Sequence, residues 1–254
     1  PAQREVMKGK DRSRSRNRAG KTGFTAVCAA ALMFAVLCVG WTSVAVREAV
    51  AAEPSARVVV VDPAHGGSDP GVKLTDKLAE KNVTLAIAKL LQKDLASTPR
   101  LAVRLTRSDD RDLTAAERVK TAREAKADLF LSLHINAGFG RTASGYEFYF
   151  PGFSATASGS NTSEDILKDM AKNKHLNDSV RFAQILQKNL ESVFPRKSRW
   201  LREAPVPVLE GLGVPAVVLE LGFATNTDDR KRISSEETWK AIARALARSF
   251  KESF

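Results

Sequence analysis

The segment AVVLELGFATN, residues 216–226, constrains the fold most strongly, because an apolar strand in it leads directly into a carboxylate. The run from Ala216 to Leu219 has the apolar, β-branched character of a strand buried in a sheet. Glu220 follows at a position where the strand should still be inside the protein. Burying an unpaired carboxylate costs several kcal/mol, so we expect Glu220 to have a partner elsewhere in the fold.

Two other apolar runs end next to residues that can bind metals or transfer protons. Residues 58–61 are followed closely by His65, and residues 129–133 lead directly into His134. Parallel strands place their carboxyl ends at one edge of a sheet, where α/β folds bind their ligands. If the three strands are parallel, both histidines and Glu220 meet at that edge. The pattern therefore predicts a hydrolytic metal site.

A catalytic zinc site has three protein ligands, commonly two histidines and one carboxylate, and keeps a fourth position for water. His65 and His134 are the candidate nitrogen ligands. Spacing alone does not choose the carboxylate, for which the candidates are Asp62, Asp69, Glu80 and Glu220. Both cysteines, Cys28 and Cys38, precede residue 53, so a zinc site after that point must consist of histidines and carboxylates.

Strand-like and helix-like segments alternate from residue 53 onward. The expected strands cover residues 58–61, 101–106, 129–133, 145–150, 206–209 and 216–219, and the expected helices cover residues 80–96, 114–126, 177–194 and 235–251. Thr114 and Glu117 form a capping box at the start of the second helix. The alternation predicts an α/β fold, a single layer sandwich with a mostly parallel sheet of about six strands flanked by helices.

Residues 1–52 predict a membrane-directed segment. Residues 1–23 carry eight basic and two acidic side chains, and the apolar stretch 22–46 is long enough to cross a bilayer. It is either a cleaved signal peptide or a retained anchor. The positive-inside rule then predicts that the domain 53–254 is exported to the periplasm or cell envelope, attached to the inner membrane if the segment is retained. Because most of the net charge of +11 precedes this segment, we do not expect a nucleic-acid partner.

Several ordered motifs resemble one family, the zinc-dependent N-acetylmuramoyl-L-alanine amidases of the amidase_3 type. The motifs are VVVDPAHGGSDPGV with Glu80 downstream, RLTRSDDRDLTAAERVKTAREAKADLFLSLHINA, GYEFYF, NDSVRFAQIL and PAVVLELGFATN. The resemblance implies that His65, Glu80 and His134 bind one Zn²⁺ and that Glu220 is the catalytic carboxylate. It also implies the substrate, which is the peptidoglycan amide between the lactyl group of N-acetylmuramic acid and L-alanine.

The resemblance suggests further site residues. Asn177 matches an asparagine near the site in the family and would bind substrate, although it is also a plausible N-cap of the helix 177–194. Asn136, just after His134, would shape the same cleft. Ala64 stands where the family usually has glycine, so the loop before His65 must accommodate a Cβ atom.

Residues 163–174 are similar to an insert that forms a helix across the active site in the regulated Gram-negative amidases. By that resemblance this segment would cover the zinc until an activator protein displaces it, with Glu164 or Asp169 near the metal. The alternative is an ordinary surface helix.

Two other functions remain open at this point. A zinc peptidase that cuts within the stem peptide would use the same metal chemistry. A non-catalytic peptidoglycan-binding regulator could retain the fold, but such proteins usually lose the ligands, and His65, Glu80, His134 and Glu220 are all present here.

Overall fold

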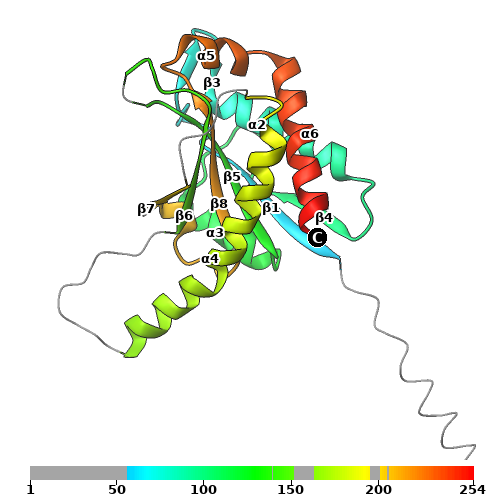
Figure 1. The fold of residues 1–254 in the computed structure, drawn as a ribbon, viewed down its shortest axis with the longest axis vertical. Helices are drawn as coiled ribbons and strands as arrows, with labels where there is room; N and C mark the ends of the chain where they lie inside the picture. The colour runs from blue at the N-terminus through cyan, green and yellow to red at the C-terminus, as the bar shows by residue number, and fades with distance from the viewer. Residues whose placement is uncertain (1–55, 139, 152–162, 195–200, 205) are drawn as a thin grey trace, which may run out of the picture. The chain divides into compact units, whose positions relative to one another are not determined.

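The computed structural model describes residues 56–138, 140–151, 163–194, 201–204 and 206–254 (Figure 1), with backbone only for 163–174, 201 and 203. They fall within one compact unit, residues 54–254. The predicted signal or anchor at residues 22–46 lies outside the described residues. Within the described part, the helices are too short or too polar to cross a membrane.

A six-stranded sheet forms the centre of this unit, with the strand order β4-β1-β5-β8-β6-β7. The strands are β1 (Arg57–Pro63), β4 (Leu101–Leu105), β5 (Leu129–Asn136), β6 (Tyr146–Pro151), β7 (Leu201–Ala204) and β8 (Ala216–Phe223). Strands β4, β1, β5 and β8 are parallel, whereas β6 runs antiparallel to β8 and β7 runs parallel to β6. A separate hairpin joins β2 (Lys73–Thr75) to β3 (Leu78–Ala79). The predicted α/β class and mostly parallel sheet are confirmed.

Helices cover the two faces of the sheet unequally. One face packs against α2 (Glu80–Leu95), α4 (Ser163–Leu190) and α6 (Glu236–Ser253), which supply most of the large hydrophobic core. The other face packs against α3 (Ala115–Glu124) and the short 3-10 helix η1 (Pro207–Leu209) in a much smaller core. The helix α5 (Thr227–Ile233) follows β8 directly. As expected, Thr114 accepts the Glu117 amide and caps α3.

The second face changes from apolar to polar along the strands. Near the start of β5 and β8 it carries Phe130, Ala216 and Val218, which belong to the smaller core. Successive side chains of a strand point to opposite faces, so His134 and Glu220 continue the same rows towards the carboxyl edge. This face therefore carries His134 and Glu220 at the carboxyl edge of the sheet.

Two predicted elements differ in the structure. Residues 163–194 form one continuous helix, α4, through Asn177, so Asn177 is not an N-cap. The expected strand 206–209 is instead η1, and the edge strand β7 lies before it. Pro207 explains the second difference, because proline lacks the amide hydrogen that a strand ladder needs and favours the first position of a helical turn.

Candidate metal centre

Three side chains from three elements meet at the carboxyl edge of the sheet. His65 follows β1, Glu80 begins α2 and His134 lies in β5. One potential ligand atom from each lies within 4.8 Å of the other two. The Oε1 atom of Glu80 is 3.1 Å from Nε2 of His65 and 3.3 Å from Nδ1 of His134. Of the four candidate carboxylates, Glu80 is therefore the one that joins the histidines.

Backbone amides hold the Glu80 carboxylate in place. Its Oε1 atom accepts the Ile135 amide at 2.8 Å and its Oε2 atom accepts the Val72 amide at 3.0 Å, while Glu80 is 1% exposed. The neighbouring Gly71 has a φ of +62°, and a Cβ atom there would lie 2.5 Å from Glu80 Oε2 and 2.6 Å from the His65 ring. Glycine at this position leaves the space that the two ligands occupy.

His65 is oriented by its second ring nitrogen. Its Nδ1 atom lies 2.6 Å from Oδ2 of Asp69, whose Oδ1 atom accepts the Gly71 amide at 3.0 Å. This contact orients the ring so that Nε2 faces Glu80 and is the nitrogen available to a metal. His65 also has a φ of +60°, an uncommon conformation for a residue other than glycine.

Two buried arginines hold the unusual backbone around His65. Arg107 donates to the carbonyl oxygens of Pro63 and Ala64, and Arg118 donates to those of Pro63 and His65. Arg118 also pairs with the buried Asp62 carboxylate at 2.6 Å. Asp62, a candidate ligand from the sequence, is therefore part of the support for the loop.

The charges of the three-residue cluster favour cation binding. Burial disfavours the charged form of His65, but the hydrogen bonds and charges of Glu80 and Asp69 outweigh it and raise the pKa of His65 to about 9. Burial would raise the pKa of Glu80, but hydrogen bonds from His134 and His65 lower it to about 2. Glu80 is thus ionised at neutral pH, and a bound metal would replace the proton on His65.

Glu220 lies beside this cluster. It is aligned with His134 in the β5–β8 pairing, and its Oε2 atom is buried without a hydrogen-bond partner among the described residues. The partner expected from the sequence is therefore missing for this oxygen. Burial raises the pKa of Glu220 to about 7, the charge of His134 opposes that rise, and the charges of Glu80 and Glu147 add to it.

These residues fit a zinc ion. Two imidazole nitrogens and one carboxylate oxygen form the ligand set of many catalytic zinc sites, in which a fourth position stays open. A buried carboxylate oxygen without a partner is unfavourable unless a ligand, water or ion satisfies it. The unpartnered oxygen of Glu220 beside the three-residue cluster therefore also points to a ligand bound at this place.

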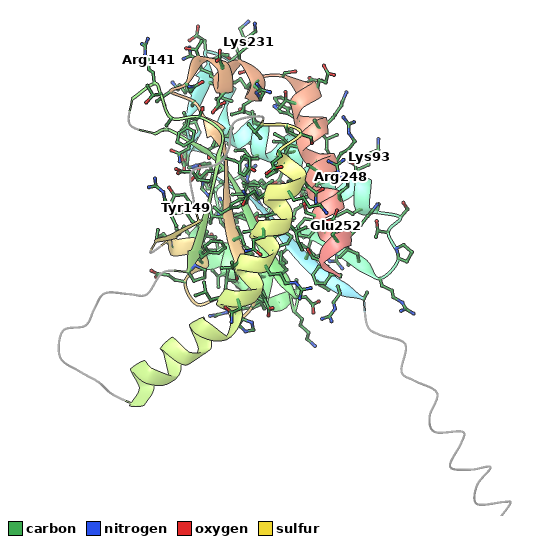
Figure 2. All side chains as sticks on the ribbon, viewed as in Figure 1. Lys93, Arg141, Tyr149, Lys231, Arg248 and Glu252 are labelled. Atoms are coloured by element: carbon green, nitrogen blue, oxygen red, sulfur yellow. The ribbon has the colours of Figure 1, made fainter. Side chains whose placement is uncertain are left out.

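Further polar residues extend the site across β6 and β7. Asn136, predicted to shape the cleft, donates to Glu147 at 3.0 Å. The hydroxyl of Tyr149, a residue labelled in Figure 2, also donates to Glu147 at 3.0 Å, and Arg202 pairs with Glu147 at 3.3 Å. Neither Glu147 nor Arg202 was among the site residues predicted from the sequence. Glu147 did leave a signal, because it is the charged residue in the aromatic strand GYEFYF.

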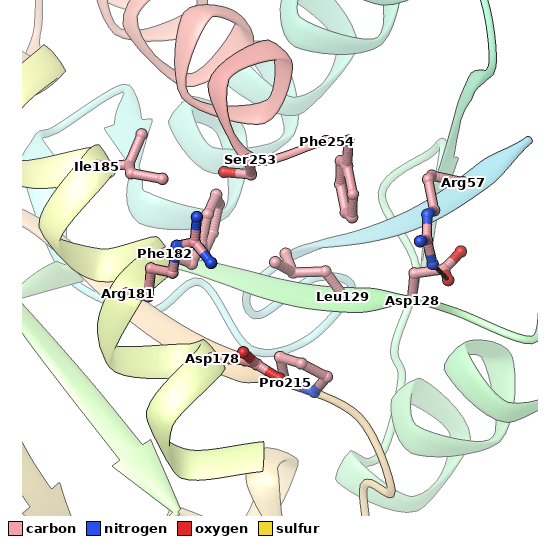
Figure 3. Close-up of a pocket in the computed structure, with 10 residues that line it drawn as sticks. All are labelled: Arg57, Asp128, Leu129, Asp178, Arg181, Phe182, Ile185, Pro215, Ser253 and Phe254. Carbon is pink, nitrogen blue, oxygen red and sulfur yellow. Dashed lines mark hydrogen bonds and ion pairs between the residues drawn. The ribbon is translucent and has the colours of Figure 1, made fainter.

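The structure does not bring Asn177 to the metal cluster. Ser179, two residues later in α4, accepts the amide of Ala216 at the start of β8, about 13 Å of strand before Glu220. The adjacent Asp178 lines a pocket with Leu129 and Pro215 at that opposite edge of the sheet (Figure 3). The continuous helix thus places Asn177 away from the metal cluster, and its predicted contact with substrate stays a prediction.

The segment 163–174 is also placed away from the cluster. Helix α4 runs towards the carboxyl edge from Ser179 to Gln187, whose carbonyl accepts the Tyr146 hydroxyl. Residues 163–174 continue the same helix in the opposite direction, beyond the body of the sheet (Figure 1). The predicted helix across the active site is not observed, and the side chains of Glu164 and Asp169 lie outside the described residues.

Comparison with known proteins identifies the family. The Amidase_3 family model, described as N-acetylmuramoyl-L-alanine amidase, matches residues 59–252. The uncharacterized protein YqiI of Bacillus subtilis is 34% identical over 77% of this chain and 84% of its own length. The amidase AmiC of Escherichia coli is 25% identical over 78% of this chain, which spans about half (52%) of AmiC.

Solved structures agree with this result. The catalytic domain of the amidase CwlV from Paenibacillus polymyxa is 29% identical, with a TM-score of 0.63 over 77% of this chain and 97% of that domain. An amidase from Clostridium difficile is 28% identical, with a TM-score of 0.65 over 78% of this chain and 96% of that structure. The chain therefore belongs to the Amidase_3 family of N-acetylmuramoyl-L-alanine amidases, hydrolases that act on peptidoglycan.

Proposed function

We propose that the domain 53–254 cleaves the amide between N-acetylmuramic acid and L-alanine with one Zn²⁺ held by His65, Glu80 and His134. Glu220 is the general base in this proposal. The observation that carries it is the convergence of the three potential ligand atoms within 4.8 Å, next to a buried Glu220 oxygen that has no hydrogen-bond partner in the part of the chain that the structure describes.

The chain's own residues account for the proton transfers. Zinc, when bound, supplies a Lewis acid that polarises the scissile carbonyl and acidifies water. The free oxygen of Glu220 accepts a proton from the attacking water and passes it to the leaving nitrogen as the C–N bond breaks. A pKa of about 7 suits both transfers at neutral pH. The products are a lactyl carboxylate and a peptide with a free L-alanine amine.

Asp69 and the two arginines have supporting roles. Asp69 holds the Nδ1 atom of His65, so that Nε2 remains available to the metal. Arg107 and Arg118 hold the carbonyl oxygens on either side of this ligand. The ligand geometry therefore depends on residues that do not touch the metal.

The family membership favours the amidase reaction over the two alternatives. A zinc peptidase with the same ligands would leave L-alanine attached to the muramic acid. A binding regulator would need neither a complete ligand set nor a free carboxylate beside it. Release of dye-labelled fragments from peptidoglycan tests catalysis: activity should disappear with chelator and return with Zn²⁺, whereas activity unchanged by exhaustive chelation would contradict the proposal.

We also propose that this domain works in the cell envelope. The support is the basic stretch 1–23 before the apolar residues 22–46, an order that directs the following domain out of the cytoplasm. Determining the amino-terminal residue of the protein recovered from cells distinguishes a cleaved signal from an anchor. Recovery of the whole chain from the cytoplasmic fraction would contradict export.

A further inference from the structure

We propose that Arg202 binds the carboxylate carried by the second residue of the stem peptide, and that Glu147 positions Arg202 for this contact. The inference rests on the proposed amidase function and specifies which substrates the site prefers. Arg202 would thus be a specificity-determining residue, two strands away from the reacting bond.

The strand register brings Arg202 to the same face of the sheet as the catalytic carboxylate. Glu147 of β6 is paired with Glu220 of β8, and Tyr149 of β6 is paired with Arg202 of β7. Residues 147 and 149 are two apart and point to the same face. Their face is also that of Asn136, which donates to Glu147. These residues form a continuous polar row from the metal cluster to the edge strand.

Glu147 connects the members of this row. It is 3% exposed, and its Oε2 atom accepts both the Asn136 amide and the Tyr149 hydroxyl at 3.0 Å. Its Oε1 atom lies 3.3 Å from Nη2 of Arg202. A buried carboxylate with this many contacts has a fixed position, so it holds the guanidinium group close to the row.

Arg202 has the exposure that a ligand-binding side chain needs. Its side chain is 52% exposed, whereas that of Glu147 is 4% exposed. The contact with Glu147 is made through Nη2, and a guanidinium group carries five N–H donors in a planar fork. The remaining donors can bind a carboxylate through two parallel hydrogen bonds, a geometry that arginine favours.

The distance between β8 and β7 allows Arg202 to contact the first carboxylate of the stem peptide beyond the scissile bond. Neighbouring strands lie about 4.8 Å apart, so β7 is about 10 Å from β8 at the level of the backbone. The long Arg202 side chain covers part of that distance, because it reaches Glu147. An extended peptide advances about 3.3 Å per residue, so a carboxylate on the residue after L-alanine is within reach when the scissile bond lies beside Glu220.

The positive charge of Arg202 also reduces the repulsion between the site and an anionic substrate. Glu147, which is buried, and Glu220, which has one buried oxygen, lie opposite each other on adjacent strands, and both carboxylates disfavour the approach of an anionic peptide. Arg202 brings a positive charge to that acidic pair. A substrate whose second residue is amidated carries no negative charge at that position, so the contact with Arg202 would add little to its binding.

Two muropeptides that differ in one group test the proposal. Both consist of a disaccharide with a short stem peptide, and the second stem residue carries either a free α-carboxylate or the corresponding carboxamide. With the zinc-loaded full chain, we expect Arg202→Gln to lower kcat/KM for the carboxylate substrate by about 10- to 100-fold, the range for a hydrogen bond to a charged group. The loss should appear in KM, and the carboxamide substrate should change less than about threefold.

Matched variants separate this role from a structural one. Arg202→Lys keeps the charge and should restore part of the preference, whereas Arg181→Gln, which changes an exposed arginine of α4, should leave it unchanged. Glu147→Gln should weaken the preference while Zn²⁺ content stays the same. Equal losses for both substrates, or no loss with Arg202→Gln, would overturn the inference alone. If the unaltered protein cleaves neither substrate, the proposed function itself fails.

Discussion

His134 and Glu220 are direct neighbours across the parallel strands β5 and β8, so one register places the proposed metal ligand beside the proposed catalytic carboxylate. A shift of that register by one residue would turn Glu220 to the opposite face of the sheet. Leu133 and Leu219 directly precede His134 and Glu220 and are buried in the large core on the opposite face of the sheet. A shift would expose one of these leucines, so the core prevents it. The packing of the core therefore fixes the geometry of the site.

Replacing Glu220 should separate chemistry from metal binding. Glu220→Gln keeps the size of the side chain but removes the proton acceptor, and general-base catalysis contributes about 10²- to 10⁴-fold. We expect kcat to fall by about that factor, with Zn²⁺ content and KM little changed. Glu210→Gln, at an exposed position before β8, is the control. A variant with nearly full kcat would show that another group is the base.

Asp69→Asn should weaken zinc binding without removing a ligand. The variant loses the carboxylate that holds Nδ1 of His65 at 2.6 Å, and outer partners of ligating histidines are commonly worth about 10- to 100-fold in affinity. Competition with a fluorescent chelator measures the dissociation constant. Asp76→Asn, at an exposed turn between β2 and β3, should bind Zn²⁺ normally. Equal affinity in the two variants would exclude an orienting role for Asp69.

Zinc affinity should depend on pH through His65. The metal-free protein holds a proton there up to about pH 9, so binding must release it. We expect the affinity to rise about tenfold per pH unit between about 7 and 9, and calorimetry in two buffers should detect close to one proton released. An affinity that is constant over this range would contradict the charged state of His65.

The stability of the metal-free protein should vary with pH in a defined direction. The pKa of His65 is raised from 6.5 to about 9, so its stabilising contribution is complete below 6.5 and is lost as pH rises through 9. The pKa of Glu80 is lowered from 4.5 to about 2, so its contribution is complete above 4.5 and is lost as pH falls towards 2. We therefore expect Tm of the chelated protein to decline above pH 6.5, and His65→Ala to reduce that decline.

Arg118→Met should destabilise the fold. The substitution leaves Asp62 buried at 1% exposure without its ion-pair partner, and breaking a buried pair in this way costs about 3 to 5 kcal/mol. Urea unfolding measures the free energy. Lys120→Met, on the exposed side of the same helix, should change it by less than about 0.5 kcal/mol. Similar stability in both variants would contradict the proposed support of the metal loop.

Local patterns predicted much of the fold. Buried strands such as β5 appear in the sequence as apolar runs, and the capping box of Thr114 and Glu117 identified the start of α3. The helix α5 was missed because it has only seven residues, although Asn226 caps it through the amides of Asp228 and Asp229. Helix α4 was divided wrongly because asparagine favours an N-cap in isolation, while tertiary packing determines where a helix starts.

The site was less predictable than the fold, because its contacts join distant segments. The strand ends pointed to His65, His134 and Glu220, but the choice of Glu80 depends on how α2 packs against β5. Arg202 left no sequence signal at all, since its role follows from the pairing of β6 with β7. Cross-strand neighbours are set by the topology of the sheet, and a single sequence does not contain that information directly.

The most direct test of the account is mass spectrometry of the products formed from a defined muropeptide in ¹⁸O-labelled water. The zinc-loaded protein should release an intact stem peptide with a free L-alanine amine, and one ¹⁸O atom should enter the lactyl carboxylate of the muramic acid. Glu220→Gln should form these products at a greatly reduced rate. Peptide fragments with L-alanine still attached to the muramic acid would show a peptidase instead, and they would contradict the proposed reaction.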